Sequence, residues 1–376
     1  MKKLHLIFLS ILFFIPACTS KPSTVVPEPT ASITPIQEPT QVNKKAILLD
    51  FAISPDGNNL AIYLNTGVYL YNVKTMKKAA FYRFESDEYY SKLNEVGTIY
   101  PPFGAPGTLA FSPDGSKIAI SGKFQDEFIS VWDLNAHEVV DYITNYPNGN
   151  YVRELEYSPD GSALLIRSTY PKSKLQCPEQ GEPAEDTLSL ISLSPRITFF
   201  EKKNCNRYSV VEFHFSENNL IYFFHFSDSS LYHIDKVNTQ TGETIISEET
   251  SIGSDGRIYD VSPNGLVFAS LDERTNIIDS VTRKRLLSLD GIINFLSDEN
   301  HFLLAHQSQL QLQENKKVIC VFSGLEYYQP YSKVSKDRKT IAVLAFNNRF
   351  FQNSIQIWDI PSCKLVNTIS FDDITQ

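Results

Sequence analysis

A four-residue turn recurs along this chain and constrains its fold more than any other feature. The tetrad Ser-Pro-Asp-Gly occupies residues 54–57, 112–115 and 158–161, and Ser-Pro-Asn-Gly occupies 262–265. In such a turn Pro fixes φ, Asp or Asn closes an Asx-type turn, and Gly accepts a positive φ. Because apolar β-branched and aromatic runs flank each tetrad, each one predicts the tip of a β-hairpin.

Weaker copies of this turn begin at Ser216, Ser297 and Ser335 and bring the number of repeats to seven. Consecutive repeats begin 35 to 58 residues apart, a length typical of propeller blades with some insertions. The run 111–140 contains a blade in sequence order, because alternating segments follow the turn and a further strand ends near Ile143. The sequence therefore predicts an all-β fold, a seven-bladed β-propeller of four-stranded antiparallel blades.

Two segments carry a family resemblance. The run 111–134, with Trp132-Asp133, and the run 355–360, with Trp358-Asp359, resemble the WD-repeat β-propellers, and the Ser-Pro-Asp-Gly turns also resemble TolB-like propellers. The resemblance covers roughly residues 45–370, although the Gly-His pair that precedes the inner strand in WD repeats is missing. It implies the propeller fold and transfers no intracellular WD-repeat role.

The N-terminus has the pattern of an export signal. Lys2 and Lys3 precede an apolar run at 4–15 that is short for a membrane span. The sequence Ile-Pro-Ala-Cys, which ends at Cys18, resembles the bacterial lipobox. We therefore expect a lipoprotein signal peptide at 1–17, acylation such as palmitate on Cys18, and a lipid anchor on the extracytoplasmic side of a bacterial cell-envelope membrane. An ordinary cleaved secretion signal is the alternative.

The segment after the leader is rich in Pro, Thr, Ser and Glu and has little contiguous apolar sequence. Repeated Pro favours an extended chain, so residues 18–44 predict a semi-rigid tether that begins at the lipidated Cys. A disordered remnant without a spacing role is the alternative. The β-propeller is then expected at 45–376.

The charge of the chain argues against nucleic-acid partners. It carries 34 Lys and Arg against 43 Asp and Glu, a formal net charge of −9, and no basic stripe with interleaved aromatic residues. Nucleic-acid binding requires neutralisation of phosphates by such a stripe. The expected contact with the membrane is therefore the N-terminal lipid.

Strand order sorts the connections of a propeller by face. We call turn face the side that carries the first-to-second and third-to-fourth connections of each blade, and loop face the opposite side. The long connections are predicted to gather on the loop face, where a rigid scaffold would present them for binding. They occupy 84–107, 144–150, 170–186, 203–207 and 346–353.

Aromatic residues in two of these connections are the predicted binding residues, since rigid rings offer contact area at small entropic cost. The alternative is that the rings fold back over the propeller. Arg349 is a candidate contact for an anion or carboxylate. The loop-face candidates are Tyr89, Tyr90, Tyr100, Phe103, Arg349, Phe350 and Phe351.

Four cysteines remain after Cys18. Cys177 and Cys205 lie in neighbouring connections of the loop face, so we predict a disulfide bond between them. Cys320 and Cys363 are assigned to outer strands of adjacent blades. Outer strands splay apart, so these two are predicted to remain thiols.

Polar side chains on the inner strands of the third to fifth repeats are the only metal candidates. Hard cations prefer carboxylate oxygens, and His with Glu or Asp can hold a transition metal. A solvated channel lining is the favoured interpretation, so no metal and no cofactor is predicted. These side chains belong to Glu154, Glu156, Glu212, His214 and Asp260.

The sequence contains no Gly-x-Ser-x-Gly, His-Glu-x-x-His, Gly-rich phosphate loop or Cys-x-x-Cys motif. We therefore expect a binding or scaffold module for a protein, peptide or glycan. One alternative is a metal-dependent, hydrolase-like enzyme that uses the channel. Another is an accessory subunit of an envelope assembly or transport complex.

Overall fold

A computed structural model describes most of the chain beyond its N-terminal segment. The chain divides into two compact units, 1–43 and 44–376, and all described residues lie in the second. The described ranges are 48–64, 66–83, 107–121, 129–143, 151–169, 186–204, 212–216, 220–226, 232–250, 257–271, 274–296, 298–306, 309–315, 317–322, 332–348 and 351–374.

The described strands of this unit form seven antiparallel sheets of four strands each, taken in sequence order. The first four sheets are β1 (Leu48–Ile53), β2 (Asn59–Leu64), β3 (Gly67–Asn72) and β4 (Lys78–Arg83); β5 (Leu109–Phe111), β6 (Lys117–Ser121), β7 (Ile129–Asp133) and β8 (Glu138–Ile143); β9 (Tyr151–Tyr157), β10 (Ala163–Thr169), β11 (Asp186–Ser192) and β12 (Thr198–Asn204); and β13 (Glu212–Ser216), β14 (Leu220–Phe226), β15 (Tyr232–Asn238) and β16 (Thr244–Thr250).

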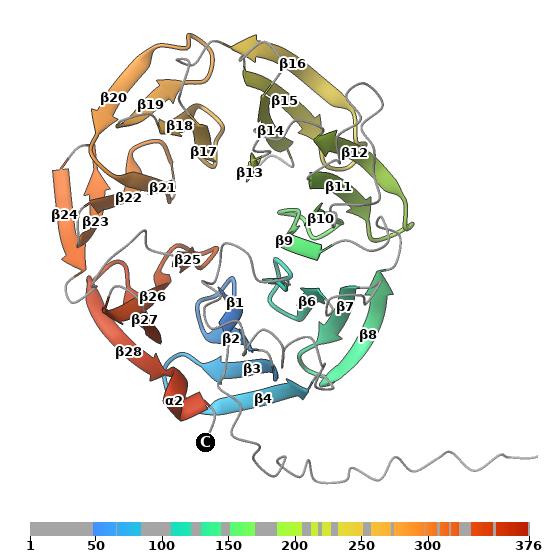
Figure 1. Cartoon of the computed structure of the whole chain (residues 1–376), viewed down its shortest axis with the longest axis vertical. Coiled ribbons are helices and arrows are strands. Elements are labelled where there is room, and N and C mark those ends of the chain that lie inside the picture. The colour runs from blue at the N-terminus through green and yellow to red at the C-terminus, as the bar shows by residue number, and fades with distance from the viewer. Residues whose placement is uncertain are drawn as a thin grey trace, which may run out of the picture. The chain divides into compact units, whose positions relative to one another are not determined.

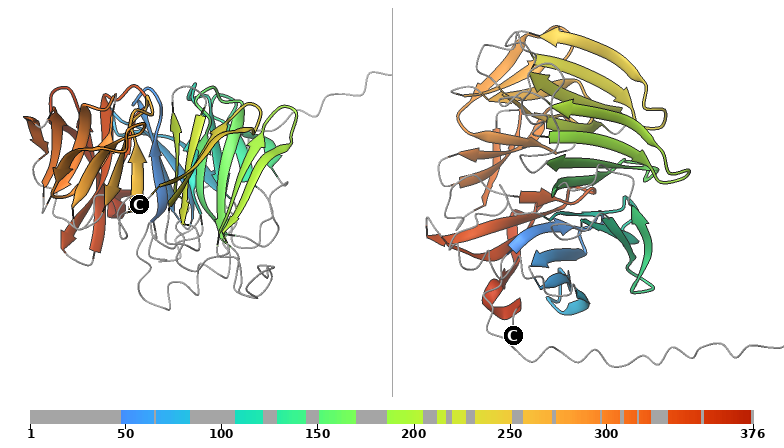
Figure 2. Two further views of the ribbon diagram at one scale, coloured as in Figure 1. Left: turned by 90° about the horizontal axis from the view of Figure 1, so that it is seen from above. Right: turned by 45° about the vertical axis from the view of Figure 1, so that its right-hand side comes forward.

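The other three sheets are β17 (Arg257–Val261), β18 (Val267–Leu271), β19 (Thr275–Asp279) and β20 (Arg285–Leu289); β21 (Ile292–Phe295), β22 (His301–His306), β23 (Gln309–Glu314) and β24 (Lys317–Phe322); and β25 (Ser332–Val334), β26 (Thr340–Asn348), β27 (Phe351–Asp359) and β28 (Lys364–Ser370). A short helix, α2 (Phe371–Ile374), follows β28. The sheets stand around one axis with the first strand of each innermost, as Figure 1 shows, and Figure 2 gives two further views. This arrangement is the all-β propeller architecture.

The recurring tetrad builds a hydrogen-bonded turn. In the second sheet the Ser112 hydroxyl donates to Asp114 Oδ1 at 2.6 Å and accepts the Lys117 N–H at 2.9 Å. Gly115 has a φ of 72° and its N–H donates to the Ser112 carbonyl, a geometry that favours Gly. The same Ser hydroxyl contact forms with Asp56, Asp160, Asn264 and Asp337 at 2.6 to 2.8 Å.

Neighbouring turns also contact one another on the turn face. A Cβ at Gly115 would lie 3.6 Å from Pro55, and one at Gly161 would lie 3.4 Å from Pro113. The Asp337 N–H donates to the Pro55 carbonyl at 3.0 Å and so joins the last sheet to the first. The tetrads therefore fix each hairpin and also help to fix the spacing of the sheets.

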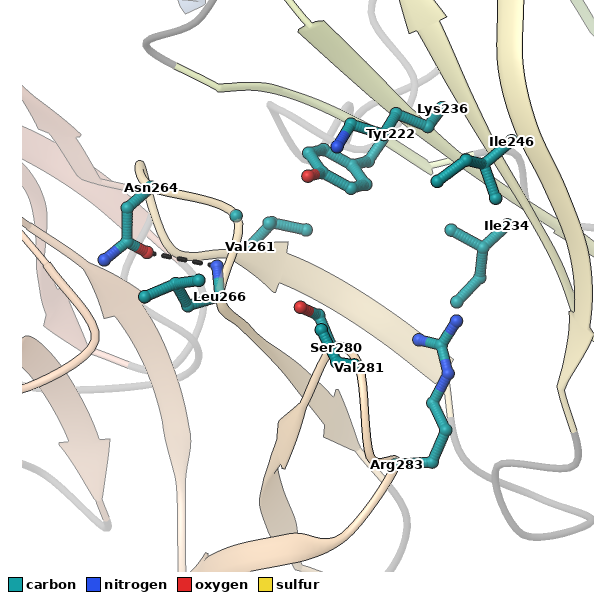
Figure 3. A pocket seen from close by; sticks show the side chains of 11 residues that line it. Tyr222, Ile234, Lys236, Ile246, Val261, Asn264, Leu266, Ser280, Val281 and Arg283 are labelled. Atoms are coloured by element: carbon teal, nitrogen blue, oxygen red, sulfur yellow. Dashed lines mark hydrogen bonds between the residues drawn. The ribbon is translucent and has the colours of Figure 1, made fainter.

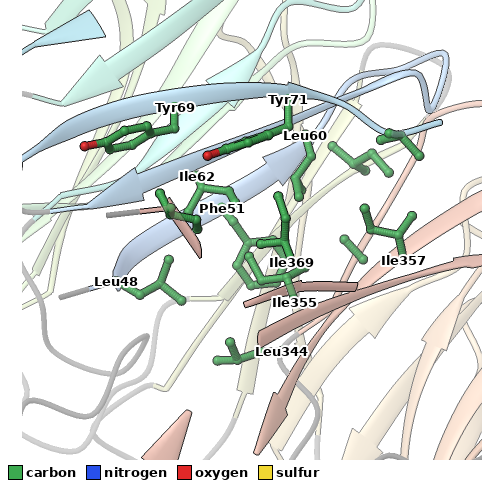
Figure 4. Close-up of a cluster of buried hydrophobic side chains, with 14 of the residues drawn as sticks. Leu48, Phe51, Leu60, Ile62, Tyr69, Tyr71, Leu344, Ile355, Ile357 and Ile369 are labelled. Carbon is green, nitrogen blue, oxygen red and sulfur yellow. The ribbon is translucent and has the colours of Figure 1, made fainter. Parts of the chain in front are cut away.

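Side-chain packing closes the ring. Phe51 and Ile62 of the first sheet share a buried cluster with Leu344, Ile355 and Ile357 of the last sheet (Figure 4). No described strand pairs outside its own sheet. The first and last sheets are therefore held together by apolar contact and individual hydrogen bonds, without an exchanged strand.

The prediction of free thiols at Cys320 and Cys363 is wrong. The two residues form a disulfide bond with an S–S distance of 2.07 Å and a Cα–Cα distance of 6.1 Å. Cys363 lies in the turn before β28, with a φ of 57°, and Cys320 lies in β24. The turn brings Cys363 within bridging range of the outer strand of the preceding sheet.

The prediction of a long loop at 346–353 is also wrong. Strands β26 and β27 continue through most of it, and Phe346 pairs with Gln352 while Asn348 pairs with Phe351. The excursion is therefore a lengthened hairpin of the last sheet, and only residues 349 and 350 lie outside the description. No helix within the described ranges is long and apolar enough to cross a membrane.

Candidate functional site

Two inner-strand carboxylates connect neighbouring sheets. Asp50 Oδ2 accepts the Thr108 hydroxyl at 2.7 Å and the Leu109 N–H at 3.0 Å, and Asp260 Oδ2 accepts the Phe295 N–H at 2.6 Å. Both aspartates stand at irregularities in the strand register, and each also accepts the N–H of the following residue. These two positions thus satisfy backbone donors of the next sheet.

Burial raises the pKa of Asp260 to about 7, against the opposing effect of the two backbone N–H donors and of Arg338. A desolvated carboxylate is less stable than its neutral acid, so burial prevails here. Asp260 was a predicted metal candidate, and the structure gives it a hydrogen-bonding role between the fifth and sixth sheets.

Glu154 and Glu156 lie on β9. Glu154 pairs with Arg167 at 3.4 Å. The enclosing protein raises the pKa of Glu156 to about 8, and the carboxylates of Glu154 and Asp260 add to this effect. The Glu156 side chain is exposed, and the neighbouring negative charges disfavour a further charge at this position.

Glu212 and His214 lie on β13, and their side chains are outside the description. Among the described residues, no group of three or more His, Cys, Asp or Glu side chains is placed to hold a metal ion. Asp50 and Asp260 accept hydrogen bonds from the sheet that follows their own. Of the five metal candidates, the three with described side chains, Glu154, Glu156 and Asp260, do not form such a metal-binding group.

Most of the loop-face candidates lie outside the described residues: Tyr89, Tyr90, Tyr100, Phe103, Arg349 and Phe350. The predicted lipidation site Cys18 and the predicted disulfide pair Cys177 and Cys205 also lie outside them. Phe351 begins β27, but its side chain is not described.

A described cavity lies elsewhere, between the fourth and fifth sheets (Figure 3). Its volume is about 340 Å³. Four lining residues come from β14, β15 and β16, and the others come from the β17–β18 and β19–β20 hairpins, so the cavity opens at the turn-face end of this seam. The lining residues are Tyr222, Ile234, Lys236, Ile246, Val261, Asn264, Gly265, Leu266, Ser280, Val281 and Arg283.

The lining combines an apolar floor with hydrogen-bond donors. Ile234 and Val261 are buried, at 5% and 7% exposed. The ammonium of Lys236 lies 5.5 Å from the centre of the Tyr222 ring, within the range of a cation–π contact. Asn264 is occupied by the turn, where its Oδ1 accepts the Leu266 N–H at 3.1 Å, the contact drawn as a dashed line in Figure 3.

Sequence reasoning missed this cavity. Tyr222 and Lys236 follow ordinary strand alternation, and Arg283 lies in a short turn. The one signal that distinguishes the region is Asn264, which replaces the Asp of the other tetrads and donates from Nδ2 to Glu299 Oε2 at 2.5 Å.

Comparisons with known proteins identify the fold alone. No family model matches the chain, and no curated protein matches it. The β-propeller domain of Cps50 (Swd1) from Myceliophteria thermophila is similar with a TM-score of 0.52 and 12% identity, over 84% of this chain and 98% of that one. KlHsv2 with its loop 6CD replaced by a Gly-Ser linker is similar with a TM-score of 0.54 and 12% identity, over 87% and 99%. At this identity the similarity confirms a β-propeller fold and carries no activity.

Proposed function

We propose that this protein is a lipid-anchored, extracytoplasmic β-propeller of a bacterial cell envelope that binds a protein, peptide or glycan through its loop face. In this role it serves as a scaffold or accessory subunit. The lipid on Cys18 holds it at the membrane, and the segment 18–44 separates the propeller from the bilayer.

The difference between the two faces carries this proposal. On the turn face the tetrads satisfy their own polar groups and contact each other. The long segments that follow Arg83, Ile143, Thr169 and Asn204 each leave and re-enter the sheets at strand ends on the opposite face. A rigid scaffold with its long connections on one side is the usual arrangement of a binding surface.

The disulfide bond between Cys320 and Cys363 supports the proposed location. Disulfide bonds persist in oxidising compartments and are rare in the reducing cytosol. Together with the lipobox that ends at Cys18, this favours an exported protein.

Capture of partners from crosslinked envelopes tests the proposed function. The wild type is compared with a Tyr89→Ala, Tyr90→Ala, Phe103→Ala variant, and the matched control is Tyr142→Ala, which removes an exposed ring from the outer strand β8. We expect the triple variant to lose its specific partners and the control to retain them. Equal capture by all three proteins would contradict binding through the loop face.

The anchor is tested separately by Cys18→Ser. Loss of the lipid is expected to move the protein from the membrane fraction to the soluble fraction, because the acyl chains on Cys18 supply the proposed hydrophobic anchor. Membrane retention that resists this change and high salt would contradict lipid anchoring.

A further inference from the structure

We propose that the cavity between the fourth and fifth sheets binds the C-terminal end of a peptide. The α-carboxylate is held by Lys236 and Arg283, and the apolar side chain of the terminal residue packs on Ile234 and Val261. The cavity lies at the turn-face end of its seam, so this inference does not depend on the proposed function of the loop face.

The polar part of the lining is rich in donors. Lys236 and Arg283 supply positive charge, and Tyr222 and Ser280 supply hydroxyls. Within the described part of the chain, neither hydroxyl makes a hydrogen bond to protein, and none of the eleven lining residues is acidic. A site with two cations and two donor hydroxyls is complementary to a carboxylate, whose oxygens only accept.

Three acidic residues adjoin lining residues in the sequence, namely Asp235, Asp260 and Asp279, and none of them lines the cavity. Asp279 accepts hydrogen bonds within its own turn. Its Oδ1 accepts the N–H groups of Val281 at 3.1 Å and of Thr282 at 2.6 Å, and also the Thr282 hydroxyl at 2.8 Å. Asp279 is not part of the cavity lining. Hydrogen bonds from Thr282, together with the charge of Arg283, nevertheless lower the pKa of Asp279. Arg283 is therefore already close to one carboxylate, and the lining itself contains two cations and no acidic residue in a chain whose formal net charge is −9.

The apolar part of the lining sets the other requirement. A volume of about 340 Å³ is at the lower end of ligand pockets, and suits one or two side chains better than a large cofactor. Leu266 and Val281 are 51% and 82% exposed at the cavity. The ligand therefore combines an anionic group with a compact apolar group, as the last residue of a peptide does.

The strand beside the cavity favours a peptide over a free small carboxylate. Ile246 lines the cavity and lies on β16, the outermost strand of its sheet, and Ile245 beside it is also exposed. The residues that precede a peptide C-terminus can extend along such an edge and pair with its backbone. A small carboxylate cannot use this surface.

Fluorescence anisotropy with paired peptides tests the inference. The probes are fluorescein-labelled octapeptides with the body Gly-Ser-Gly-Ser-Thr-Val-Thr and each of the twenty amino acids at the C-terminus, prepared as free acids and as amides. We expect free acids that end in Leu, Ile, Val or Phe to bind, and their amides to bind about tenfold or more weakly, because the amide loses the charge-assisted contacts. Free acids and amides of equal affinity would overturn the proposal.

Lys236→Gln and Arg283→Gln locate the binding. Each is expected to weaken binding of the free acid about tenfold and to leave binding of the amide unchanged. Lys284→Gln is the matched control, because it removes the same charge from the same turn but does not line the cavity. Equal effects of Lys284→Gln and Arg283→Gln, or no effect of either cavity variant, would overturn the assignment. Octanoate that binds as tightly as the best peptide would overturn the choice of a peptide.

Discussion

The Gly of the turn tetrad has a different neighbour in two seams, the one between the first and last sheets and the one between the fourth and fifth sheets. A Cβ at Gly57 would overlap the Thr340 hydroxyl, and a Cβ at Gly265 would overlap the Tyr222 hydroxyl. In both seams Gly allows a side chain of the preceding sheet to approach the turn. Thr is small and leaves the seam closed, whereas the Tyr222 ring stands at the edge of a cavity.

The other contacts also show that the seam between the first and last sheets is more tightly packed than the seam between the fourth and fifth sheets. The closing seam contains an extended buried cluster, and the Asn367 side-chain amide donates to the Val73 carbonyl across it at 2.6 Å. Of the described residues in the other seam, Ile234, Val261 and Ile278 form a small cluster beside the cavity. One seam thus closes the ring, and the other has room for a ligand.

Matched core truncations should show the largest difference between the seams. Ile355→Ala, in the closing seam, is expected to lower the free energy of unfolding by about 4 kcal/mol, because it leaves a cavity in a packed cluster. Ile234→Ala already borders a cavity and should cost about 2 kcal/mol. Urea unfolding followed by tryptophan fluorescence measures both, with the exposed Val140→Ala as a control near zero. Equal losses at the two positions would contradict the difference in packing.

Removal of the disulfide bond should have the next largest effect, and it tests the seam between the last two sheets. The double variant Cys320→Ser, Cys363→Ser loses a crosslink over 43 residues between the last two sheets. It is expected to lose about 3 kcal/mol of stability, chiefly because the unfolded chain gains freedom. Reductant should destabilise the wild type more than the variant, in which the predicted Cys177–Cys205 bond is the remaining target. Peptide mass spectrometry that finds both thiols free in the purified protein would contradict the bond.

The repeated turn was enough to predict the propeller and its four-stranded units, because the chemistry of that turn is local. Ser112, Asp114 and Gly115 contact each other within four residues of sequence, and their pattern is therefore visible in the chain. The seam cavity is not visible in this way. Tyr222, Lys236 and Arg283 meet only when two sheets pack, and each has an ordinary sequence context.

The polar inner-strand positions were found from the sequence, but their role was not. Counting back from Ser262 identifies Asp260 as a polar residue among apolar ones, and Asp50 has the same place before Ser54. These residues accept hydrogen bonds from the next sheet because the strand register is irregular beside them, and such an irregularity cannot be predicted from the sequence. Similarly, the pairing of Cys320 with Cys363 depends on a turn with positive φ at Cys363.

Asp260 should make the fifth and sixth sheets sensitive to pH. Its pKa is about 7 in the folded protein, against an ordinary value of 3.8, so its contribution to stability is full below about pH 4 and is lost as the pH rises through 7. Asp260→Asn stays neutral and should remove roughly 2 kcal/mol of this dependence.

Urea unfolding at a series of pH values between 4 and 8 measures this dependence. The raised pKa of Glu156 has the same sign, so some slope should persist in the variant. Asp114 and Asp160 act in a separate window, because hydrogen bonds lower their pKa to about 2 and their contribution is lost only as the pH falls below about 4. An unchanged slope in Asp260→Asn would contradict the assignment.

The smallest expected effect distinguishes the tetrad at the cavity from the others. Asn264 donates from Nδ2 to Glu299 Oε2, whereas Asp114 accepts from Ser112 and Ser116. Asn264→Asp restores the common tetrad but sets a second carboxylate against Glu299. It should cost about 1 kcal/mol at pH 7.

This cost should shrink at pH 4 and in high salt, since protonation and screening both relieve repulsion between carboxylates. The additional change Glu299→Gln should restore the stability of Asn264→Asp, because the amide can donate to the new carboxylate. A cost that persists in the double variant would contradict repulsion from Glu299 as its cause, since Asp would accept the Leu266 N–H and the Ser262 hydroxyl just as Asn264 does.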